Sequence, residues 1–188
     1  MSDRAEDSGS RTAVRTIRIP EPTDRALEKI ADDDGRSVNA EINSIIREHL
    51  EHNIKMQEFG FAVFPRQFFK AIIEELDEDT LARIGRGVVP AMWKDMASFW
   101  DQDSSPEGIL RYLKKRMRLT HNVQTTITQE MGEYAIVYRH DFGPKWSILM
   151  KSAFQEFVSK SFHVEPKISA GESVVSVRFK TNPRSSSD

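Results

Sequence analysis

The stretch Val14-Arg15-Thr16-Ile17-Arg18-Ile19-Pro20 decides the fold of the N-terminal part of the chain. Its two isoleucines, Ile17 and Ile19, alternate with polar residues, and this period of two predicts a short, half-buried strand. Pro20 has no amide hydrogen to donate, so the strand ends there. A single strand cannot form a sheet, and we therefore expect two chains to pair their strands. A paired two-stranded ribbon is one of the few protein shapes that fit the major groove of DNA.

Two short amphipathic helices are predicted to follow the strand. Pro22 suits the first turn of a helix, and Gly35 is a natural left-handed residue just past a helix C-terminus. Ser37 is a good N-cap for the second helix. Along that helix, one broad stripe contains Val38, Ile42, Ile45, Ile46, His49 and Leu50. The expected unit has the order strand, helix, helix over about residues 11–53.

Residues 11–53 resemble the ribbon-helix-helix family, the class of the Arc repressor. The resemblance rests on Thr16-Ile17-Arg18-Ile19-Pro20 and on Gly35-Arg36-Ser37-Val38-Asn39-Ala40-Glu41-Ile42. It covers less than a quarter of the chain. It implies an obligate dimer, in which the strands of two chains pair antiparallel above four helices. The size of the unit supports a dimer independently, because so short a unit buries too little apolar surface to fold alone.

The resemblance assigns the reading of DNA bases to the outward side chains of the strand, Val14, Thr16 and Arg18. Arg18 can donate two hydrogen bonds to guanine, and Thr16 can bond to a base edge or touch a thymine methyl group. Val14 departs from the polar residue expected at its position and can give only an apolar contact.

The start of the second helix is expected to contact the DNA backbone. Its amides without helical partners and its positive dipole end can hold a phosphate. For this contact the resemblance implies Ser37, Val38 and Asn39. Two further residues, Arg36 and Glu41, match positions that belong to a buried Arg–Glu–Arg triad in Arc. Ile45 stands at the third position, so we expect only an Arg36–Glu41 pair here.

The overall charge does not favour strong non-specific DNA binding. The chain has 27 Lys and Arg residues against 29 Asp and Glu residues, a net charge of −2. Residues 11–55 hold eight basic and nine acidic residues. However, no acidic residue lies between Arg11 and Ile19, and Arg11 and Arg15 add positive charge. Any DNA affinity should therefore depend on this local patch and on the fit of the ribbon.

The bulk composition excludes several classes of protein. The absence of cysteine excludes disulfides and thiolate metal sites, and it fits a reducing cytoplasm, the location we expect. No apolar run approaches the roughly 18 residues of a membrane-spanning helix. Met1 to Ser10 is polar and of mixed charge, so we expect a disordered tail rather than a signal peptide, and residues 182–188 form a second tail.

The second unit, over about residues 59–181, is predicted to be an α+β domain. Helical patterns cover Pro65–Leu76, about Asp79–Trp100 and Pro106 to about Met117. Alternating strands at Val123–Thr128 and Tyr134–Tyr138 flank a turn at Met131-Gly132-Glu133. A helix from Pro144 to about Phe162 follows, and a second hairpin, Lys167–Ser169 with Val174–Phe179, closes the domain. The order predicts a two-layer domain of ββαββ type.

Gly85-Arg86-Gly87 lies inside the second of these helical patterns. It is too short to be a phosphate-binding loop. A bend or a close helix crossing is the more natural interpretation.

Several other chemistries are weaker alternatives. His49 and His52 are spaced i, i+3, near the spacing of metal ligands. His140, Asp141 and Ser147 could line a pocket, but nothing else resembles the parts of a serine hydrolase. We expect a capped helix start in that region, no cofactor and no enzymatic activity. An antitoxin whose C-terminal part binds a partner protein, or a module that responds to a metal or small molecule, remains an open alternative.

The sequence therefore predicts a dimeric, sequence-specific DNA-binding regulator. Its second unit would serve oligomerisation or the sensing of a small ligand or protein partner.

Overall fold

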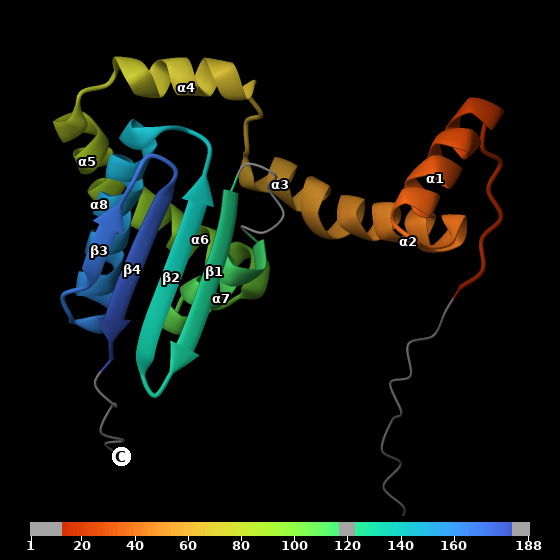
Figure 1. Ribbon diagram of the computed structural model, residues 1–188. Helices are drawn as coiled ribbons and strands as arrows, with labels where there is room; N and C mark the ends of the chain where they lie inside the picture. Colours follow the sequence, from red (N-terminus) through yellow and green to blue (C-terminus); the bar gives the residue numbers. More distant parts are fainter. Residues whose placement is uncertain (1–12, 117–122, 182–188) are drawn as a thin grey trace, which may run out of the picture. The chain divides into compact units, whose positions relative to one another are not determined.

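The chain divides into two units, at residues 1–60 and 61–188. The computed structural model describes residues 13–116 and 123–181 of the chain (Figure 1). The two predicted tails, at 1–10 and 182–188, and the end of the third helical pattern at Met117 lie outside the described residues.

Residues 13–60 of the first unit contain four helical segments in a row. α1 (Glu21–Asp33) and α2 (Val38–Glu48) pack against each other. α2 continues through a π-helical turn, η1 (His49–Asn53), into α3 (Ile54–Phe59). The segment ends at Gly60, whose φ of 90° is a left-handed conformation that suits glycine. The predicted helices are confirmed, and the second one runs further than its apolar stripe indicated.

The second unit is an α+β domain, as predicted. Its helices are α4 (Arg66–Glu75), α5 (Glu78–Gly87), α6 (Val89–Asp101), α7 (Pro106–Arg116) and α8 (Pro144–Phe162). The strands are β1 (Val123–Glu130), β2 (Glu133–His140), β3 (Lys167–Ala170) and β4 (Val174–Lys180). They form an antiparallel four-stranded sheet in the order β1-β2-β4-β3.

The sheet forms one layer, and helices cover one of its faces. α8 packs on β3 and β4, and α7 packs on β1 (Figure 1). Alternate residues of each long strand are buried, as in Tyr134, Ile136 and Tyr138 of β2. This alternation is the pattern of a sheet with one covered and one open face. The core between the layers includes Trp93, Phe154, Leu81 and Leu113, all of them almost fully buried.

The first hairpin has the turn that its sequence predicts. Met131 and Gly132 connect β1 to β2, and both have positive φ angles, of 47° and 79°. A two-residue turn with two positive φ angles matches the twist of the flanking strands. The pairing of Gln129 with Tyr134 and of Ile127 with Ile136 fixes the register of the hairpin.

Gly85 allows α5 and α8 to approach closely. A Cβ at this position would lie 2.2 Å from the carbonyl oxygen of Leu149 on α8. The helical pattern also breaks at Val88, between α5 and α6. The sequence left a bend and a close crossing as alternatives, and the structure has both.

α4 presents apolar residues on two sides. Phe69 packs edge-on against Phe142 and Trp146, at ring distances of 5.7 and 5.5 Å. On another side, Phe68 contacts Phe64, which precedes the helix, and both rings remain more than half exposed. No helix within 13–116 and 123–181 combines the length and the apolar character that crossing a membrane requires.

Candidate nucleic-acid interface

Residues 13–20, here called the ribbon segment, precede α1 and belong to no helix or strand. Val14 is 89 % exposed and Ile17 is 58 % exposed, while Ile19 is half-buried. Thr16 and Arg18 are exposed. Pro20 caps α1 with an extended backbone, at φ −60° and ψ 141°.

The expected strand over the ribbon segment is wrong for the single chain. None of residues 13–20 pairs with another strand. The expectation that Ile17 faces the helices is also wrong here, because its side chain is mostly in solvent. The physical reason is the one the sequence suggests, since strand hydrogen bonds need a neighbouring strand and residues 13–60 offer none.

The turn between α1 and α2 is built as its glycine predicts. Gly35 has a φ of 65°. The amide of Arg36 donates to the carbonyl of Ala31 at 2.9 Å, and the amide of Gly35 donates to Asp32 at 3.1 Å. These two bonds make a Schellman motif, which satisfies the last carbonyls of α1. The motif fixes where α2 begins.

The start of α2 has the properties of a phosphate contact. The Ser37 hydroxyl accepts a hydrogen bond from the amide of Ala40 at 3.2 Å, so Ser37 is the predicted N-cap. The amides of Val38 and Asn39 lie in the first turn, where no helical carbonyl precedes them. Ser37 and Asn39 are exposed and Val38 is half-buried. The positive end of the helix is therefore accessible at the three residues that the resemblance implied.

The predicted Arg36–Glu41 pair is present. Arg36 Nε lies 3.1 Å from Glu41 Oε2, and the same guanidinium also contacts Asp34. Glu41 is only 7 % exposed. Because two carboxylates hold Arg36, its charge is already compensated, whereas Arg18 has no ion-pair partner among residues 13–116 and 123–181.

The first unit leaves a set of large apolar side chains in solvent. We call this set the open apolar face. Its members range from 43 % to 58 % exposed and are Ile17, Ile30, Ile45, Ile46 and Leu50. Within residues 13–60 the buried side chains are Ala31 and Glu41 alone. A helix pair with so little buried surface lacks a core of its own.

The alternative chemistries have little geometric basis in the part of the chain described. No three His, Asp or Glu side chains there gather closely enough to hold a metal ion. His49 and His52 lie in the π-helical turn η1, which the sequence did not predict.

His140 and Ser147 form a buried hydrogen bond, with 2.8 Å between Nε2 and Oγ. His140 Nδ1 accepts from the amide of Phe142 at 3.3 Å, so in the neutral ring Nε2 carries the hydrogen. A catalytic histidine would need Nε2 as the acceptor for the serine proton. Asp141 contacts Arg66 instead. The hydrogen bond between His140 and Ser147 therefore anchors the start of α8 to the end of β2.

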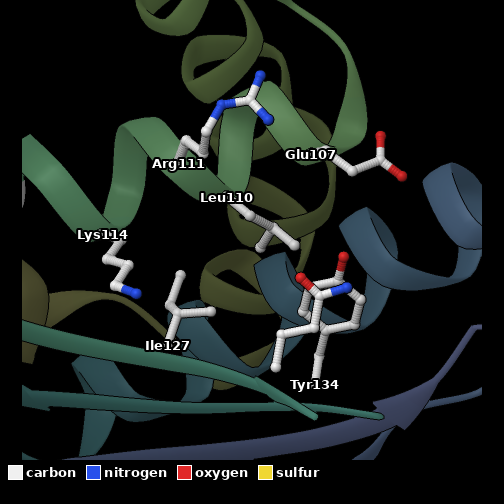
Figure 2. Close-up of a pocket in the computed structure, with 7 residues that line it drawn as sticks. Glu107, Leu110, Arg111, Lys114, Ile127 and Tyr134 are labelled. Carbon is white, nitrogen blue, oxygen red and sulfur yellow. The ribbon is translucent and has the colours of Figure 1, made fainter. Parts of the chain in front are cut away.

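A hollow that no expectation from the sequence included lies between α7 and the β1–β2 hairpin (Figure 2). The residues lining it come from segments far apart in the sequence, such as Leu110, Lys114 and Tyr134. Period-two alternation places Tyr134 on the covered face of the sheet, but no local signal in the sequence indicates that its side chain lines a hollow.

Comparison of the chain with models of known protein families, with curated proteins and with solved structures found no match in any of the three.

Proposed function

We propose that this protein is a sequence-specific DNA-binding regulator of ribbon-helix-helix type that acts as a homodimer in the cytoplasm. Two ribbon segments pair antiparallel and enter the major groove, where Thr16 and Arg18 read bases and Val14 gives an apolar contact. The starts of the two α2 helices, at Ser37, Val38 and Asn39, hold the flanking phosphates. The second unit serves oligomerisation or sensing.

One observation carries this proposal, namely that the first unit is incomplete in a specific way. It has well-formed helices joined by a Schellman turn, an open apolar face and an unpaired ribbon segment. A second copy supplies both missing parts, because it covers the apolar face and pairs the ribbon segment. Burying apolar surface stabilises by about 25 cal/mol per Å², so covering five large side chains per chain favours the dimer.

The charge pattern supports DNA as the partner of the ribbon. Arg18 is an exposed cation near the end of the run without acidic residues, and no carboxylate pairs with it in the described chain. α1 carries acidic residues in its first turn, Glu21 and Asp24. Phosphates would therefore be attracted to the ribbon and the α2 start and repelled by α1.

Selection of binding sites from random duplex DNA at fixed salt tests the proposal. We expect an enriched motif with two half-sites for the unaltered chain. Arg18→Ala should reduce discrimination at one base pair of each half-site by roughly tenfold or more. Asn39→Ala should weaken binding to all sequences alike, because phosphate contacts carry no sequence information.

Arg25→Ala is a matched control, because it removes an exposed arginine that contacts Glu21 on α1. It should leave both the motif and the affinity unchanged. If no motif is enriched, or if Arg25→Ala matters as much as Arg18→Ala, the proposal is wrong.

The dimer has its own test. All three tryptophans lie in the second unit, so far-UV circular dichroism reports the helices of both units while tryptophan fluorescence reports the second alone. On dilution, we expect helix signal to be lost without a change in fluorescence. Ile46→Asp should shift this loss to higher protein concentration. A helix signal independent of concentration would contradict an obligate dimer.

A further inference from the structure

The hollow between α7 and the β1–β2 hairpin has a volume of about 310 Å³. α7 contributes Glu107, Leu110, Arg111 and Lys114, and the hairpin contributes Ile127, Gln129 and Tyr134. Pockets for small molecules span roughly 300–1,000 Å³, so this one suits a short ligand.

The middle of the hollow is apolar. Leu110 and Ile127 are 4 % and 6 % exposed, so their side chains belong to the core and only a small part of each lines the hollow. Ile127 lies on the covered face of β1, two residues before Gln129, and Gln129 pairs with Tyr134 across the hairpin. A strand rises by about 3.3 Å per residue. Gln129 and Tyr134 therefore lie together at one end, and Ile127 lies further along.

Tyr134 is the unusual side chain of the hollow. It is 6 % exposed, and its ring is fixed by stacking on Phe179 at 5.0 Å and by contact with Phe162 at 5.8 Å. Its hydroxyl makes no hydrogen bond to residues 13–116 and 123–181 and is not one of the buried unpaired polar atoms there, so solvent in the hollow reaches it. Figure 2 shows the ring reaching from the sheet toward α7.

The phenol remains protonated at neutral pH. Burial raises the pKa of Tyr134, the carboxylate of Glu107 raises it further, and the guanidinium of Arg111 opposes both. The hydroxyl can therefore both donate and accept one hydrogen bond inside the hollow.

Two opposite charges stand at the two ends. Glu107 and Lys114 are seven residues apart on α7, which is about 10 Å along the helix. In the described residues neither has an ion-pair partner. Arg111 is different, because it contacts Asp103, and Figure 2 shows its guanidinium turned away from Tyr134. The hollow thus runs from a cation at Lys114, past Leu110 and Ile127, to Glu107, Gln129 and Tyr134.

We propose that this hollow binds a small zwitterion, in which a short apolar chain separates a carboxylate from an amine. The carboxylate pairs with Lys114, and the chain covers Leu110 and Ile127. The ammonium group pairs with Glu107 and donates to the oxygens of Tyr134 and Gln129. The assignment does not depend on DNA binding, since the site lies wholly within the second unit.

Isothermal titration of the full-length chain with 6-aminohexanoate, in the absence of DNA, tests this proposal. We expect saturable binding. Hexanoate lacks the amine and hexylamine lacks the carboxylate, so each should bind about tenfold or more weakly, the cost of one charge-assisted hydrogen bond.

Substitutions locate the site. Lys114→Gln and Glu107→Gln should each weaken binding of 6-aminohexanoate by about tenfold or more. Lys115→Gln is the matched control, because the neighbouring lysine of α7 lies 3.8 Å from Asp101 and does not line the hollow. It should bind as the unaltered chain does.

Two further variants keep the test decisive. Tyr134→Phe preserves the stacked ring and should weaken binding while the melting temperature is retained. Lys114→Glu alone and Glu107→Lys alone should each abolish binding. The double variant that carries both changes should bind 6-aminohexanoate again, with the carboxylate and the ammonium group of the ligand in exchanged positions. The proposal is overturned if 6-aminohexanoate shows no saturable binding, if hexanoate binds equally well, or if the two single variants leave the affinity unchanged.

Discussion

The substitution Gly85→Ala tests the close crossing of α5 and α8. The added methyl carbon would lie 2.2 Å from the carbonyl oxygen of Leu149, and 3.1 Å from the Cβ of Ser152. Real contacts of this kind are longer by more than 1 Å. The nearest atom belongs to the backbone of a long buried helix and cannot rotate away. The two helices must therefore move apart.

Two opposing terms set the size of the effect. Overpacking of a tight site costs about 1–3 kcal/mol. Replacement of glycine by alanine within a helix stabilises the helix by about 1 kcal/mol, because alanine has the higher helix propensity. Because the clash is with backbone, we take the upper part of the first range and expect a net loss of about 1–2 kcal/mol. For a unit of this size, that corresponds to a fall in Tm of roughly 3–10 °C.

Thermal unfolding followed by tryptophan fluorescence is the appropriate assay, because all three tryptophans lie in the second unit. Gly87→Ala is the control within the same helix, since a Cβ there meets nothing within 4 Å. It should leave the Tm unchanged or raise it slightly. If Gly85→Ala melts at or above the temperature of the unaltered chain, the interpretation of this crossing is wrong.

Three further predictions concern single hydrogen bonds. Burial lowers the pKa of His140, with the carboxylate of Asp141 opposing, so the unfolded chain takes up this proton first and stability should fall as the pH drops below about 6.5. His140→Gln should flatten the dependence of Tm on pH between 7 and 5; an unchanged slope would contradict this assignment. Trp146→Phe removes the donor to the buried Tyr138 hydroxyl, a bond of 3.1 Å, and should cost about 1–3 kcal/mol by denaturant unfolding. The double variant with Tyr138→Phe should cost less than the sum of the single changes. Ser37→Ala removes the N-cap of α2 and should reduce the stability of the first unit by about 1 kcal/mol, measured by far-UV circular dichroism at high protein concentration.

The elements that the sequence predicted well are those whose signals are local. The helix predicted from Pro144 to about Phe162 has these bounds in the structure, because Pro144 fits a first turn and an apolar stripe from Trp146 to Val158 follows it. The turn at Met131 and Gly132 is marked locally by Gly132, which adopts positive φ without a steric penalty. In such cases the residues that determine the local structure are close to it in the sequence.

The features that were missed depend on residues far apart or on another chain. The hollow needs α7 to lie against the β1–β2 hairpin, and no spacing within α7 indicates that Lys114 will stand opposite Ile127. The π-helical turn at His49–Asn53 also had no local signal that we identified. The strand over Ile17 and Ile19 has a correct period but lacks a partner in the single chain.

The two units differ in what completes them, and this difference bears on how regulation would work. The second unit holds its own core, including Trp93, Phe154 and Leu113, so its hollow can bind a ligand whether or not the chain is paired. The first unit buries Ala31 and Glu41 alone within residues 13–60, so its DNA-reading form would exist only in the dimer. A ligand could then alter DNA binding only by changing the dimerisation equilibrium or the geometry between paired chains. The first route predicts a ligand effect that vanishes at high protein concentration, whereas the second predicts one that persists.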